Sequence, residues 1–164
     1  MPGRDPFAAT HDTDAYVARP ATERALHALE EGLRAGERLL LLRGPSGIGK
    51  TLLLRLLGER VGDAFHVVHV DVPSLEPDDF WAWVEGSLTA TVRSAGRAGP
   101  PDDAPRLLVI DDGETLPPAT VAALGAATTA VGSRLHAVLT ATDGEAGDAL
   151  ADALGQRVLA VALE

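Results

Sequence analysis

The stretch that decides the fold is Gly44-Pro45-Ser46-Gly47-Ile48-Gly49-Lys50-Thr51. It fits G-x-x-x-x-G-K-S/T, the pattern of a phosphate-binding loop. Residues 38–43 before it form a short, largely apolar run that is typical of a buried parallel strand, and residues 51–57 after it favour a helix, which is expected to end near Gly62. The alternative is a glycine-rich turn that matches by chance. The strand before the loop and the helix after it favour the phosphate-binding loop.

The residue types of this stretch fit the chemistry of a bound polyphosphate. Gly44, Gly47 and Gly49 let the backbone amides approach the phosphates closely, and the following helix adds the positive end of its dipole. Lys50 would reach the β- and γ-phosphates, and the Thr51 hydroxyl would bind Mg²⁺. Lys50 is the only lysine of the chain, which favours a specific need for an ammonium group there. We expect all eight residues of the loop to surround a nucleotide.

Length and composition limit the class of protein. The 164 residues suffice for one domain with a core, and 46% hydrophobic and 23% charged residues are ordinary for a globular protein. The net charge of −10 gives no basic surface and disfavours direct nucleic-acid binding. The sequence has no cysteine, no signal-peptide pattern at its start and no apolar run of membrane-spanning length. We therefore expect a cytoplasmic protein without a membrane span.

Helical and strand patterns alternate along the rest of the chain. Residues 1–19 form an irregular N-terminal arm, and residues 20–164 form a single P-loop domain. Helices are expected at residues 22–35, 77–93, 117–131 and 145–154, and further strands at 65–71, 106–111, 135–142 and 157–163. Strands that alternate with helices predict an α/β fold, with a parallel sheet covered by helices.

A second motif lies at residues 107–111, where Leu107-Leu108-Val109-Ile110 is followed by Asp111. Four apolar residues and an acid match the Walker B pattern, which is weak alone and much stronger downstream of a phosphate-binding loop. Asp111 would hold Mg²⁺ through its water shell while Thr51 binds the ion directly. An aspartate that caps the next helix is the alternative interpretation.

With both motifs in order, the chain resembles the AAA-type ATPases of the additional-strand class. Within that class it is most similar to the general secretion pathway protein A group and to the transposition helper ATPases. The similarity covers nearly the whole chain. Besides the phosphate-binding loop, it rests on Pro6-Phe7, Tyr16, the expected helix 22–35, Pro73-Ser74-Leu75, Asp111-Asp112-Gly113-Glu114-Thr115-Leu116-Pro117 and Gln156-Arg157. The loop is a specific motif, and the other features are loose patterns in the right order.

The resemblance implies a three-layer P-loop NTPase with a parallel five-stranded sheet in the order 5-1-4-3-2. It also implies ATP and Mg²⁺ bound at the carboxyl ends of the strands. Members of the family continue past the fifth strand into a helical lid, whereas this sequence stops at Glu164 without one. The chain is therefore expected to be either a fragment or a minimal ATPase with an open site. Both weak nucleotide binding and slow hydrolysis would follow.

The resemblance also implies catalytic roles beyond that of the loop lysine. Asp112 stands where the family has a glutamate that orients the attacking water, and Glu114 is the alternative for that role. Thr142 corresponds to the polar residue that senses the nucleotide, with Thr140 on the same strand face as the weaker choice. Arg157 corresponds to an arginine presented to the nucleotide of a neighbouring subunit, which requires self-association. Otherwise Arg157 is a surface or ion-paired residue.

The leading hypothesis is an Mg-ATP-binding domain that hydrolyses ATP slowly and serves as a nucleotide-dependent switch or assembly ATPase. Its protein partner is not identified by the sequence. A non-catalytic nucleotide-binding interaction module is the first alternative, supported by Asp112 and by the missing lid. A DNA-transaction helper ATPase of the transposition type is the second, and the acidic charge counts against it. A small-molecule kinase is a lower alternative, because the additional-strand pattern argues against it.

Overall fold

The computed structural model describes residues 17–71, 74–94, 100–155 and 158–164. Of residues 89–94 it describes the backbone alone. Several residues that carry the family resemblance lie outside this range, namely Pro6-Phe7, Tyr16, Pro73 and Gln156-Arg157. The expectations placed on them stay predictions. The same holds for most of the N-terminal arm, of which only residues 17–19 are described.

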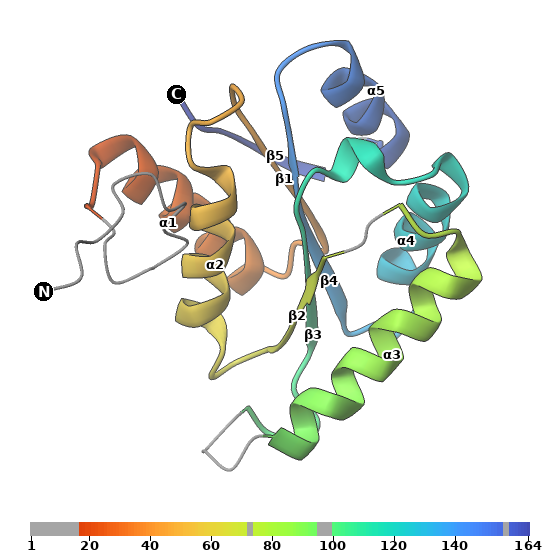
Figure 1. Ribbon diagram of the computed structural model, residues 1–164. Helices are drawn as coiled ribbons and strands as arrows, with labels where there is room; N and C mark the ends of the chain where they lie inside the picture. Colours follow the sequence, from red (N-terminus) through yellow and green to blue (C-terminus); the bar gives the residue numbers. More distant parts are fainter. Residues whose placement is uncertain (1–16, 72–73, 95–99, 156–157) are drawn as a thin grey trace, which may run out of the picture.

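Helices and strands alternate along the described residues, as the sequence predicts (Figure 1). The helices are α1 (Pro20–Arg34), α2 (Lys50–Val61), α3 (Pro77–Ser94), α4 (Pro118–Thr129) and α5 (Glu145–Leu154). The strands are β1 (Leu39–Arg43), β2 (His66–Val70), β3 (Arg106–Ile110), β4 (Leu135–Ala141) and β5 (Val158–Ala162). The bounds fall within about two residues of the expected ones, the ordinary scatter of element ends. The sequence does not predict a short 3₁₀ helix, η2 (Gly113–Thr115), after β3.

The five strands form one parallel sheet in the order β2-β3-β4-β1-β5. This is the order 5-1-4-3-2 counted from the other edge, so the predicted topology is confirmed. β4 lies between β1 and β3, and its residues Ala137, Val138 and Leu139 are fully buried. A parallel strand covered on both faces needs apolar side chains throughout, which explains the unbroken apolar runs in the sequence.

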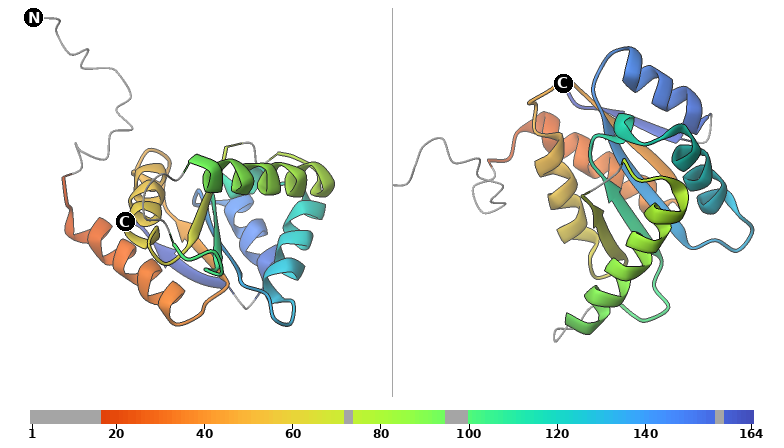
Figure 2. Two further views of the ribbon diagram at one scale, coloured as in Figure 1. Left: turned by 90° about the horizontal axis from the view of Figure 1, so that it is seen from below. Right: turned by 45° about the vertical axis from the view of Figure 1, so that its right-hand side comes forward.

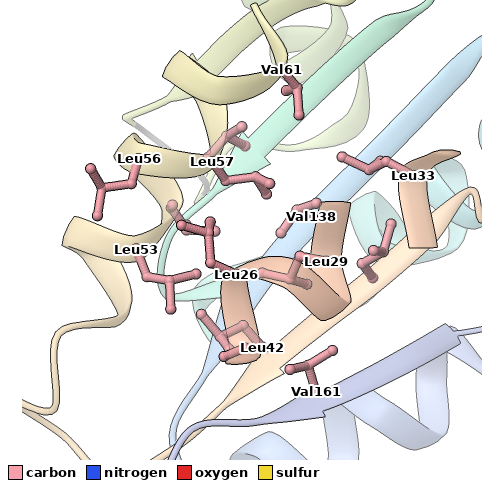
Figure 3. Packing of buried hydrophobic residues seen from close by; sticks show 14 of the residues in the cluster. Leu26, Leu29, Leu33, Leu42, Leu53, Leu56, Leu57, Val61, Val138 and Val161 are labelled. Carbon is pink, nitrogen blue, oxygen red and sulfur yellow. The ribbon is translucent and has the colours of Figure 1, made fainter. Parts of the chain in front are cut away.

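Helices cover both faces of the sheet, which gives three layers (Figure 2). Successive strand residues point to opposite faces, so each strand contributes to two cores. On the first face, Leu42 and Val138 pack against Leu26 of α1 and Leu57 of α2 (Figure 3). The core on the second face joins the strands to α3, α4 and α5 and includes Leu39, Leu41, Phe80, Leu124, Leu139 and Leu150. The predicted three-layer α/β fold is confirmed.

Parallel strands bring their carboxyl ends to one edge of the sheet. The phosphate-binding loop follows β1, Asp111 follows β3 and Thr142 follows β4, and these strands are adjacent in the order β1-β4-β3. Segments that are up to about a hundred residues apart in sequence therefore meet at this edge. Open α/β sheets bind their ligands at such an edge.

Candidate functional site

The loop between β1 and α2 has the backbone shape that its glycines permit. Gly47 and Gly49 have φ values of 79° and 106°, in the left-handed region where a side chain would be strained. Gly49 immediately precedes α2, whose first amides donate no hydrogen bond to a capping side chain. Uncapped amides at a helix N-terminus carry partial positive charge and attract an anion. The start of α2 therefore has amides without a capping side chain, and phosphate binding by this loop stays a prediction.

The start of the loop is bonded to the strands on either side. The Gly44 amide donates to the Ala141 carbonyl at the end of β4, at 3.3 Å. The Leu163 amide, just after β5, donates to the Arg43 carbonyl at 2.7 Å. A Cβ atom at Gly44 would lie 2.7 Å from the Leu163 carbonyl oxygen, so glycine is required there. The chain after β5 thus lies directly against the loop (Figure 1).

Lys50 lies within the curve of the loop backbone. The residue is only 7% exposed, and its Nζ donates to the carbonyl oxygens of Gly44 and Pro45 at 2.8 and 2.9 Å. These two bonds hold the ammonium group against the loop. An ammonium group has three hydrogens, so one remains to donate to a phosphate oxygen. The phosphate-binding role that the motif gives Lys50 stays a prediction.

Thr51 and Asp111 are in direct contact, although α2 and the end of β3 are far apart in sequence. Thr51 Oγ1 donates a hydrogen bond to Asp111 Oδ2, and Thr140 Oγ1 donates one to Asp111 Oδ1. Among the described residues no group of three or more His, Cys, Asp or Glu could hold a metal. Mg²⁺ needs no such cage, because it is commonly held by one or two protein oxygens together with phosphate oxygens and water. Thr51 and Asp111 fit this ligand set.

Asp112 combines an unusual backbone conformation with a crowd of acidic groups. Its φ and ψ are 49° and 53°, and it is the only described residue other than glycine with a positive φ. Its amide donates to Thr140 Oγ1 at 2.9 Å and to Asp111 Oδ1 at 3.2 Å. Burial, followed by repulsion from Asp111 and Glu114, raises the pKa of the Asp112 carboxyl, and Lys50 opposes this shift. Strained backbone and a shifted pKa occur together at functional sites.

Glu114 and Thr142 form a second polar contact at the same edge of the sheet. Glu114 lies in η2, and its Oε1 accepts hydrogen bonds from the Thr142 amide at 3.1 Å and from Thr142 Oγ1 at 2.7 Å. Its Oε2 is buried and has no hydrogen-bond partner within the described part of the chain. A buried carboxylate oxygen without a partner is a ready acceptor for a water molecule.

A cavity of about 370 Å³ adjoins the Thr51–Asp111 pair. It lies between α2 and the carboxyl ends of β2 and β3. The residues that line it are Thr51, Leu54, Arg55, His69, Val70, Asp71, Val109, Asp111, Asp112 and Thr115. The site therefore has open space beside Thr51 and Asp111.

The structure brings together every predicted site residue that it describes. Arg157 lies outside the described residues, so its role stays a prediction, as do the catalytic roles of the others. Sequence reasoning ranked Thr140 below Thr142, but the hydroxyl of Thr140 is the one that contacts Asp111 and Asp112. Strand alternation predicts that both threonines share one face, so it does not distinguish between them.

Comparison with known proteins yields one family and a group of solved structures. Residues 33–150 match the model of the AAA domain family. This range runs from the end of α1 into α5 and includes both motifs. No curated protein sequence matches the chain. In the described residues, no helix is long and apolar enough to cross a membrane.

The similar solved structures come from proteins of low sequence identity. Cdc6p from Pyrobaculum aerophilum has a TM-score of 0.57 and 19% identity, covering 89% of this chain and 47% of its own. Domain III of the replication initiation protein DnaA from Thermotoga maritima has a TM-score of 0.55 and 21% identity, covering 98% and 69%. A RuvB mutant from Thermotoga maritima has a TM-score of 0.53 and 21% identity, covering 93% and 48%. The chain thus spans about half the length of the Cdc6p and RuvB chains, and the likeness concerns the fold.

Proposed function

The chain belongs to the AAA domain family, and we propose that it binds Mg-ATP, hydrolyses it slowly and acts as a nucleotide-dependent switch or assembly ATPase. The observation that carries this proposal is the contact between Thr51 and Asp111 beside the buried Lys50. The contact joins the two motifs that phosphate binding and metal binding require. It brings them to the edge of the sheet where ligands of such folds bind.

In this proposal the loop amides and Lys50 hold the β- and γ-phosphates. Thr51 would bind Mg²⁺ directly and Asp111 through water, and the ion would neutralise charge on the phosphate oxygens. Hydrolysis requires a water whose oxygen bonds to the γ-phosphorus while the bond to the ADP oxygen breaks. The proton of that water passes to a carboxylate or to the released phosphate.

Two carboxylates are candidates to orient the water. Asp112 is close to Asp111, and its raised pKa makes it a better base than an ordinary aspartate. Glu114 has a longer side chain and a buried oxygen without a partner, but its other oxygen is engaged by Thr142. Neither candidate is a glutamate that directly follows Asp111 and has both carboxylate oxygens free of hydrogen bonds to the protein. Slow hydrolysis is therefore the expectation.

The test is calorimetric titration of Mg-ATP into the wild type and into Lys50→Ala, with phosphate release measured in parallel. A hydrogen bond to a charged group contributes about 1.5–3 kcal/mol, so the variant should bind about 10- to 150-fold more weakly. Arg134→Ala removes an exposed cation just before β4, at the amino ends of the strands and so away from the loop, and serves as the control. It should bind as the wild type does. Absence of binding by the wild type, or equal binding by Lys50→Ala, would refute the proposal.

A non-catalytic nucleotide-binding module is the second candidate function. The engagement of Glu114 by Thr142 favours it, because this carboxylate is already hydrogen-bonded within the protein. The same experiment separates the two functions. Intact Mg-ATP binding with no phosphate release favours the module, and measurable turnover that depends on Lys50 favours the ATPase.

Within the family, the residues around Asp111 and Asp112 resemble those of the general secretion pathway protein A group and the transposition helper ATPases. On this basis we propose that the chain binds a protein partner. One candidate is a second copy of this chain, whose bound nucleotide Arg157 would contact. The net charge of −10 supports a protein rather than a nucleic acid as the partner.

A further inference from the structure

Thr140 is a fully buried polar residue in the central strand of the sheet. It is 0% exposed, as are Ala137, Val138, Leu139 and Ala141 of the same strand, all of which are apolar. A buried hydroxyl lowers stability unless its hydrogen bonds are satisfied. The partners of this hydroxyl therefore decide what the residue does.

Both partners of the Thr140 hydroxyl belong to the acidic end of β3. Its hydrogen is donated to Asp111 Oδ1, and its oxygen accepts the amide hydrogen of Asp112 at 2.9 Å. A hydroxyl has a single hydrogen, and here that hydrogen forms the hydrogen bond to Asp111. Because the residue is fully buried, its hydroxyl is not available to a nucleotide. Thr140 therefore acts through its two neighbours or not at all.

The two oxygens of the Asp111 carboxylate are held from opposite sides. Thr51 bonds Oδ2, and Thr140 bonds Oδ1. Thr51 is itself expected to bind the metal ion. The hydrogen bond from Thr140 would then be the one that still holds the Asp111 carboxylate when the ion is present. The same hydroxyl anchors the left-handed turn at Asp112, whose amide makes one other hydrogen bond to the described residues, the 3.2 Å bond to Asp111.

We propose that Thr140 is a positioning residue of the metal site, which fixes the Asp111 carboxylate and the Asp112 turn together. The proposal rests on the proposed binding of Mg-ATP. It assigns Thr140 no contact with the nucleotide, so it differs from a nucleotide-sensing role. Groups that orient a metal-binding carboxylate commonly alter metal affinity about 10- to 100-fold when they are lost.

Thr140→Val removes the hydroxyl with little change of shape, and Thr140→Ser retains it. We would measure ATP affinity as a function of Mg²⁺ concentration, and in EDTA. Thr140→Val should need about 10-fold or more Mg²⁺ for half-maximal effect, with unchanged affinity in EDTA. Thr140→Ser should behave as the wild type. Thr128→Val is the matched control, because Thr128 is also buried and its hydroxyl bonds, within the described residues, to carbonyls of α4 alone.

A second measurement needs no nucleotide. Amide hydrogen exchange at Asp112 should be at least about 10-fold faster in Thr140→Val than in the wild type or Thr128→Val, because the closer of its two acceptors is gone and only the longer bond to Asp111 remains. Thr140→Ala loses the same hydroxyl with less bulk and takes the place of Thr140→Val if that variant does not fold. Unchanged exchange at Asp112 overturns the inference by itself.

The outcomes also separate this inference from the proposed function. If the wild type does not bind Mg-ATP, the proposed function and the Mg²⁺ role of Thr140 both fail. If the wild type binds but Thr140→Val shows the same Mg²⁺ requirement, only the inference fails. An equal loss in Thr128→Val would also overturn it, because the effect would then be general destabilisation.

Discussion

Gly147, in the first turn of α5, is a position where a single methyl group should disturb both the fold and the site. A Cβ atom there would lie 2.1 Å from the Thr142 carbonyl oxygen and 3.4 Å from Arg43 Nη2. The carbonyl belongs to the backbone and cannot rotate away, so α5 must shift from the end of β4. That helix buries Leu150 and Leu154 in the core, and its movement strains their packing.

Overpacking of this kind costs about 1–3 kcal/mol, and we expect the upper part of that range because the overlap is with backbone. For a domain of this size, 1 kcal/mol corresponds to about 2–4 °C in Tm, so Gly147→Ala should lower the Tm by about 6–12 °C. Thermal and urea unfolding would measure the change. Phosphate release should fall too, because Thr142, which bonds Glu114, adjoins the displaced turn.

Gly125→Ala supplies the matched control for this prediction. Gly125 also lies in a helix, α4, but in the described part of the chain no atom beyond its neighbours and its own helix backbone lies within 4 Å of a Cβ built there. Alanine is favoured over glycine in a helix interior by about 1 kcal/mol, so this variant should gain about 2–4 °C in Tm. The same chemical change is expected to act with opposite sign at the two positions. A Gly147→Ala variant as stable as the wild type would refute the reasoning.

Two further predictions concern pH. Burial first, then Asp111 and Glu114, raise the pKa of Asp112 above 3.8, so ionising it costs stability. Asp112→Asn should therefore raise the Tm at neutral pH without Mg²⁺, and this gain should vanish at pH values below 3.8. The same variant should abolish or reduce turnover. A lower Tm at neutral pH would contradict the prediction. Burial first, with help from Arg38, lowers the pKa of His136 below 6.5, so its contribution to stability is full above that pH and is lost as pH falls toward the folded pKa. Urea unfolding between about pH 5 and 8 should show a drop on the acid side that His136→Gln reduces, and an unchanged profile in the variant would count against the assignment.

The phosphate-binding loop is accessible from the sequence, because its chemistry fixes both the residue types and their spacing. Asp111 is accessible as an acid that ends an apolar strand downstream of that loop. The strand order came from the family resemblance and agrees with the structure. The ranking of Thr140 and Thr142 was not accessible. Alternation alone puts Thr140 of β4 and Thr142 just after it on the same side, and which of them meets Asp111 depends on the register of β3 against β4. Ile110 pairs with Leu139, so the residues that follow them, Asp111 and Thr140, come to lie side by side.

The turn after β3 was hidden for a similar reason. A Cβ at Gly113 would lie 3.0 and 3.1 Å from side-chain atoms of Leu150 and Leu139, so η2 depends on how α5 and β4 pack against it. No local pattern in the sequence reports that contact. The end of α4 shows the same dependence, since the helix stops at Thr129 and leaves Val131 wholly exposed.

The hydrogen bond from the Leu163 amide to the Arg43 carbonyl has a mechanical consequence. It joins the strand exit at β5 to the residue that precedes the phosphate-binding loop, and the close approach of the Leu163 carbonyl to Gly44 leaves no slack between them. A displacement of the backbone after β5 would therefore strain this hydrogen bond at the start of the loop, and a rearrangement of Gly44 would strain it in turn.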